Sequence, residues 1–195
     1  MSRKNKFYIG FVVIVIVGYV TYKVILVSAF GTPKDFSDAR ERGALISQEI
    51  VGLSNDLNSR LKEINELDKS GNLTEALQKT TELATKSVEI RARAVDLSAE
   101  MEKMTSSLPK IKEEEAKQAV LDSVSNRLAL ISRLINYSDY VYQLLDVLRQ
   151  RFTNQYVESG KVSSLISKIN DEVQAINTFN QSAISAMEKF DAISK

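Results

Sequence analysis

The chain has 195 residues, with 26 Lys and Arg against 25 Asp and Glu, and it contains no His, Cys or Trp. The lack of Cys and His excludes disulfides, thiolate and imidazole metal sites, and Ser–His–Asp or cysteine-based catalysis. Seven Gly and two Pro leave few turn-forming residues, which disfavours a many-stranded sheet. No Gly-rich phosphate loop or nucleophile elbow occurs, so we expect no enzyme activity, no cofactor and no metal.

The net charge of +1 is a sum over two unlike parts of the chain. Residues 1–30 hold Arg3, Lys4, Lys6 and Lys23 and no acidic residue, so 22 basic and 25 acidic residues remain in 31–195. That longer part has no strong field of one sign, and we therefore expect no nucleic-acid partner.

Residues 7–30 form an apolar stretch of 24 residues in which Lys23 is the only charge. As a helix it spans about 36 Å, enough for a hydrocarbon core of about 30 Å. Lys23 lies near its end, where a long side chain reaches the interface. The sequence predicts a transmembrane helix after a short basic tail at 1–6. The predicted anchor residues are Phe7, Tyr8, Phe11, Tyr19, Tyr22, Lys23 and Phe30.

The dense basic cluster of Arg3, Lys4 and Lys6 favours a cytoplasmic N-terminus, with residues 31–195 outside the cytosol at the cell membrane. One alternative is a cleaved signal peptide, because residues 27–29 (Val-Ser-Ala) fit the small-residue cleavage rule. A second alternative is the inverted topology, because the basic counts on the two flanks are close.

Four stretches with apolar residues spaced three and four apart follow the apolar segment. Thr32 and Pro33 suit the start of the first helix, and Gly71, Pro109 and Gly160 mark the breaks between helices. The predicted helices cover about 33–69, 73–107, 110–159 and 161–194. Short connections favour antiparallel neighbours, so we expect an all-α chain whose residues 31–195 form an elongated antiparallel four-helix bundle, a coiled-coil rod.

The third predicted helix carries two apolar stripes. One runs from Val120 through Leu128 to Phe152, and the other consists of Tyr137, Tyr140, Leu144 and Val147. Because a bundle helix normally needs one stripe, the second is a candidate partner interface. The alternative interpretation is that this helix is simply the most buried of the four.

Polar residues interrupt the apolar stripes at Arg60, Arg127 and Asn180. Polar residues at such positions commonly fix the alignment of helices at some cost in stability. We therefore predict that these three residues set the register of the bundle or lie at its edge.

Taken together, these patterns predict a single-pass membrane protein whose bundle is a structural scaffold or an accessory subunit of a membrane-associated assembly. Its expected partners are the lipid bilayer and another protein or a second copy of the chain. One alternative is a ligand-binding or sensory bundle that works through a partner. Another is a cytoplasmic, membrane-tethered rod of the spectrin-like kind.

Overall fold

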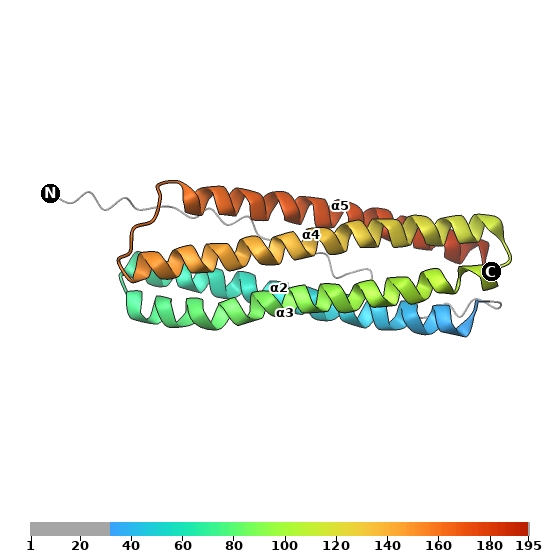
Figure 1. Cartoon of the computed structure of the whole chain (residues 1–195), viewed down its shortest axis with the longest axis horizontal. Helices are drawn as coiled ribbons and strands as arrows, with labels where there is room; N and C mark the ends of the chain where they lie inside the picture. Colours follow the sequence, from blue (N-terminus) through green and yellow to red (C-terminus); the bar gives the residue numbers. More distant parts are fainter. Residues whose placement is uncertain (1–31, 195) are drawn as a thin grey trace.

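The computed structural model describes residues 32–194, and within them four α-helices pack together into an elongated rod without a strand (Figure 1). The helices are α2 (Lys34–Ser70), α3 (Leu73–Ser106), α4 (Glu114–Phe152) and α5 (Lys161–Ile193), with a short 3-10 helix, η2 (Leu108–Lys110), between α3 and α4. The all-helical prediction is thus confirmed. The predicted basic tail at 1–6 and the predicted span at 7–30, with all their anchor and topology residues, lie outside the described range.

None of the helices within residues 32–194 has the length and apolar character needed to cross a membrane.

Successive helices run in opposite directions, so α2 begins and α5 ends at the same end of the rod (Figure 1). Helix α3 packs against both α2 and α4, and α4 packs against both α3 and α5. At the shared end, α2 meets α5 through the rings of Phe36 and Phe190, whose centroids lie 5.1 Å apart.

Gly71 ends α2 as the sequence predicts. Its φ of 80° is left-handed, and the backbone N–H of Asn72 donates to the carbonyl of Leu67 at 2.9 Å, which closes a Schellman cap. The side chain of Asn72, at the start of α3, donates to Glu75 at 2.7 Å. The turn is therefore tight, and α3 returns directly along α2.

Helix α4 is shorter than the predicted 110–159. Residues between η2 and Glu114 are extended, and the helix ends at Phe152 because Asn154 adopts a φ of 56°. The N–H of Gln155 then donates to the carbonyl of Gln150 at 2.9 Å, a Schellman cap made with Asn in place of Gly. Gly160 lies at the N-cap of α5. The first helix also differs slightly, since Pro33 occupies its N-cap.

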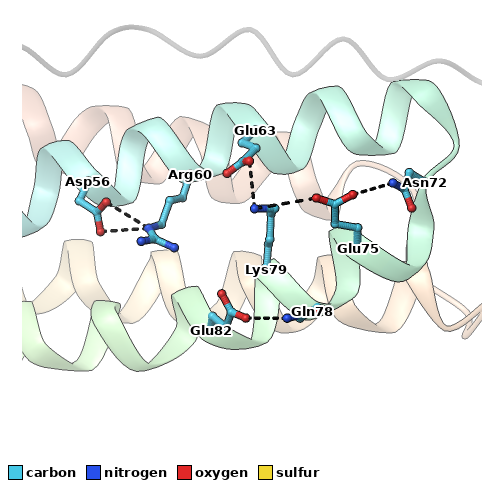
Figure 2. A network of polar contacts seen from close by, with 8 residues as sticks. All are labelled: Asp56, Arg60, Glu63, Asn72, Glu75, Gln78, Lys79 and Glu82. Carbon is cyan, nitrogen blue, oxygen red and sulfur yellow. Dashed lines mark hydrogen bonds and ion pairs between the residues drawn. The ribbon is translucent and has the colours of Figure 1, made fainter.

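A row of ion pairs joins α2 to α3 along one side of their contact. The charged positions recur every seven residues on both helices. In each pair, the two residues lie equally far from Gly71 along the sequence, one before it and one after it. The pairs are Arg42–Glu100, Glu49–Arg93, Asp56–Lys86 and Glu63–Lys79. Figure 2 shows the part of this row nearest the turn, where Lys79 lies between Glu63 and Glu75. We call these four pairs the α2–α3 ladder.

The core is a single cluster along the rod, and most of the predicted stripe positions are buried in it. Leu128 is an exception, because its side chain is 47% exposed. Gly43, which interrupts the apolar stripe of α2, lies against α3. A Cβ there would come within 3.3 Å of the Met101 side chain, so Gly43 allows the two helices to approach closely.

Candidate interaction surface

The predicted partner interface on α4 is mostly inside the bundle. Tyr137, Leu144 and Val147 are buried, and Tyr140 is half-buried with the Nζ of Lys168 5.1 Å from the centre of its ring. These residues therefore do not form an exposed patch, and the alternative interpretation describes them better. The physical reason is that α4 packs against both α3 and α5, so it needs a wide apolar arc.

Tyr137 is the largest fully buried side chain of the described residues. Its hydroxyl has no hydrogen-bond partner, and burial raises the pKa of the phenol. A tyrosine in this setting contributes packing, and its hydroxyl is not presented to a partner.

A different apolar stripe lies on the outside of α4. It consists of Leu121, Leu128, Ile135 and Tyr142, at successive intervals of seven residues. Leu121, Leu128 and Tyr142 are exposed and Ile135 is half-buried. A seven-residue interval drifts by only about 20° per repeat around a straight helix, so these side chains share one face. The bundle leaves Leu121, Leu128 and Tyr142 exposed, whereas Ile135 packs partly against the core.

Helix α3 extends this apolar surface. Val88 and Val95 are 52% and 54% exposed, and Arg91, between them, donates to Asp139 of α4 at 2.8 Å. Because α3 and α4 are antiparallel, counting from this ion pair places Val88 level with Tyr142 and Val95 level with Ile135. The six residues of both helices form what we call the outer α3–α4 face. They are Val88, Val95, Leu121, Leu128, Ile135 and Tyr142.

The outer α3–α4 face is also sparsely charged. Within residues 32–194, Arg91–Asp139 is the one ion pair that joins α3 to α4, whereas α2 and α3 share the four pairs of the ladder. Removing water from an apolar surface crossed by a single ion pair costs less free energy than removing it from a densely charged surface. This favours contact with another protein.

The three predicted register residues have different surroundings. Arg60 is half-buried and binds Asp56 of its own helix, with Nε 3.1 Å from both carboxylate oxygens (Figure 2). It therefore supports the ladder only through Asp56. Asn180 is half-buried on α5. Arg127 is half-buried on α4, and its Nε is buried without a hydrogen-bond partner.

Two serines, by contrast, join α4 to its neighbours through hydrogen bonds. The Ser123 hydroxyl donates to the carbonyl of Ala183 in α5 at 2.9 Å, and the Ser138 hydroxyl donates to the carbonyl of Ser87 in α3. Sequence reasoning did not single out Ser123. It also missed the ladder, although the mirror symmetry of its charges about Gly71 is a signal present in the sequence.

Within residues 32–194, no group of three or more carboxylate, imidazole or thiol side chains is placed to hold a metal ion.

No family model matches the chain, and no curated protein and no solved structure matches it. Functional inference therefore depends on the residues and geometry described above.

Proposed function

We propose that the chain is a single-pass membrane protein whose helical rod is a scaffold or accessory subunit of a membrane-associated assembly, binding another protein through the outer α3–α4 face. The observation that carries the proposal is the exposed apolar stripe of α4, which the bundle leaves uncovered. The elongated rod supplies reach, and the apolar residues 7–30 supply a membrane anchor.

The proposed topology places the N-terminus in the cytoplasm and the rod outside it, because of the basic cluster before the apolar stretch. Protease added to intact cells and to inverted membrane vesicles tests this arrangement. We expect an epitope fused after Lys195 to be cleaved in intact cells and protected in the vesicles. The reverse pattern contradicts the topology, and release of the rod by alkaline carbonate contradicts the anchor.

Charged substitutions on the outer α3–α4 face test the contact. Leu128→Asp and Tyr142→Asp introduce a carboxylate at exposed positions, so the fold tolerates them. We expect each variant to recover at least tenfold less partner, or second copy, from solubilised membranes, since a desolvated carboxylate at an interface costs more than about 1.4 kcal/mol.

Leu45→Asp is the matched control, because Leu45 lies on α2 and is 50% exposed, as Tyr142 is. Thermal unfolding followed by circular dichroism establishes that all three variants remain folded. If the folded α4 variants recover as much partner as Leu45→Asp does, the outer α3–α4 face is not the contact surface.

A further inference from the structure

One ion pair lies within the outer α3–α4 face. Arg91 of α3 donates from Nη1 to Asp139 of α4 at 2.8 Å, and the two side chains remain 54% and 44% exposed. On α3, Val88 lies three residues before Arg91 and Val95 four residues after it. The ion pair therefore lies between two apolar levels of the face and stays open to charges from a partner.

The apolar residues around the ion pair are arranged alike on the two helices. On α4, Tyr142 lies three residues after Asp139 and Ile135 four residues before it, in reverse order to the two valines of α3. Because the helices are antiparallel, each apolar level carries one residue from α3 and one from α4. The level between them carries a cation on α3 and an anion on α4. The face therefore matches a copy of itself when α3 of one copy meets α4 of the other.

We propose that the partner at the outer α3–α4 face is a second copy of the chain, packed face to face with the two rods parallel. This inference rests on the proposed function, which takes the face as a contact surface, and it names the partner. A two-fold axis along the rods, between the two faces, places α3 of each copy against α4 of the other at the same level. Val88 then meets Tyr142 of the second copy, and Val95 meets Ile135 of the second copy.

The charges favour this arrangement over the antiparallel one. In the parallel pair, Arg91 of each copy lies against Asp139 of the other, so the four charges alternate in sign. A two-fold axis across the rods, centred on the ion pair, would instead place α3 against α3 and α4 against α4. Arg91 would then face Arg91 of the second copy, and Asp139 would face Asp139. Like charges that face each other at an interface disfavour association.

The parallel arrangement also agrees with the proposed anchor. Helix α2 of both copies then begins at the same end of the paired rods (Figure 1). The apolar residues 7–30, which precede α2, can thus enter one bilayer from both copies. In the antiparallel arrangement the two α2 helices would begin at opposite ends.

Charge reversal in differently tagged full-length copies tests the pairing. Two copies are co-expressed, the membranes are solubilised in non-ionic detergent, and one tag is used to recover the other copy. Arg91→Glu in both copies makes all four charges negative, and Asp139→Arg in both copies makes them all positive. We expect each to reduce recovery of the second copy about tenfold. One copy of each variant restores an opposite charge across every contact between copies, and we expect it to restore most of the recovery.

Arg93→Glu is the matched control for these reversals. Arg93 lies on the same helix, is 47% exposed and pairs with Glu49 of α2, away from the outer α3–α4 face. We therefore expect Arg93→Glu in both copies to leave recovery of the second copy at the wild-type amount.

Single cysteines test the orientation, because the chain has no Cys and a disulfide can then form only between copies. Val88→Cys in one copy and Tyr142→Cys in the other are both at exposed positions, and the parallel pair brings them together. We expect copper–phenanthroline oxidation of intact membranes to give a linked band that carries both tags. Val88→Cys with Val95→Cys should give no such band, because these positions face each other only in the antiparallel pair.

Three results would overturn the inference. Wild-type copies might not recover each other, the mixed charge variants might recover as little as the matched ones, or Val88→Cys might link to Val95→Cys in place of Tyr142→Cys. The proposed function is judged separately in the first case. If Leu128→Asp still reduces the recovery of a different protein, the outer α3–α4 face remains a contact surface and only its assignment to a second copy is wrong.

Discussion

Four ion pairs at successive heptads join α2 to α3, whereas one longer pair, Arg133–Glu172 at 3.6 Å, joins α4 to α5 within residues 32–194. The α4–α5 contact instead combines apolar burial with the Ser123 hydrogen bond to Ala183. Two hairpins of similar length in one rod thus obtain their alignment from different interactions.

The difference matters because the two kinds of interaction respond to different conditions. Exposed ion pairs contribute little stability each and are screened by salt, although their positions distinguish the correct register from its neighbours. Buried apolar area contributes about 25 cal/mol per Å² and is largely insensitive to salt screening and pH. We therefore expect the α2–α3 hairpin to respond to pH and ionic strength, and α5 to respond to the volume of its apolar side chains.

The largest expected effect comes from shortening a buried side chain of α5. Leu165→Ala leaves a cavity at a buried position, which we expect to lower the free energy of unfolding by about 3 kcal/mol. Urea denaturation followed by circular dichroism measures this change. Leu128→Ala is the control and should cost under about 0.5 kcal/mol, because Leu128 is exposed. Similar losses for the two variants would contradict the description of α5.

Much of this fold follows from the sequence, because apolar spacing identifies helices and Gly71 identifies the first turn. The limits of α4 were harder to predict. The sequence placed the end of this helix at Gly160, but Asn154 takes a left-handed conformation first, so α4 ends seven residues earlier than the predicted 159. Asn adopts this conformation more readily than most residues, but its identity alone does not indicate that a helix must end there.

The interaction surface was harder to predict than the helices. Periodicity shows how many apolar stripes a helix carries, but it does not show which neighbour covers each one. Tyr137 and Leu144 are therefore buried, which is one of the two outcomes that the sequence left open, and Leu128 is exposed although it was expected in the core. The arrangement of α3 and α5 around α4 decides between these outcomes.

Glu100 gives the next largest effect, because it is the most buried carboxylate of the ladder. Burial alone would raise the pKa of Glu100, but hydrogen bonds from Lys103 and Arg42 outweigh burial and hold the pKa below its usual 4.5. A lowered folded-state pKa means that this stabilisation is present above pH 4.5 and is lost as the pH falls through the lowered value. We expect Glu100→Gln to cost about 1 kcal/mol at pH 7 and to weaken the dependence of stability on pH.

Urea denaturation at several values between pH 7 and pH 3.5 measures the contribution of Glu100. The wild-type and Glu100→Gln stabilities should approach each other as the pH falls. Two curves that stay parallel over this range would show that the ion pairs of Glu100 do not contribute to the acid sensitivity of α2–α3.

Asp56 gives the smallest effect and the sharpest test of screening. Its carboxylate accepts a hydrogen bond from Lys86 of α3, which is the main reason that its pKa is lowered, and another from Arg60 (Figure 2 shows the Arg60 contact). The side chains of Asp56, Arg60 and Lys86 are between 32% and 37% exposed, so water screens their interaction. We therefore expect Asp56→Asn to lower the free energy of unfolding by only about 0.5 kcal/mol at low salt.

At 1 M sodium chloride the Debye length falls to about 3 Å, so the difference between Asp56→Asn and wild type should nearly vanish. Glu82→Gln is the matched control, since Glu82 accepts a hydrogen bond from Gln78 of its own helix and is not part of the ladder. Urea denaturation at low and high salt compares the three proteins. If the cost of Asp56→Asn is unchanged at 1 M salt, Asp56 acts through packing or a persistent hydrogen bond, and the electrostatic account of the α2–α3 register fails at this position.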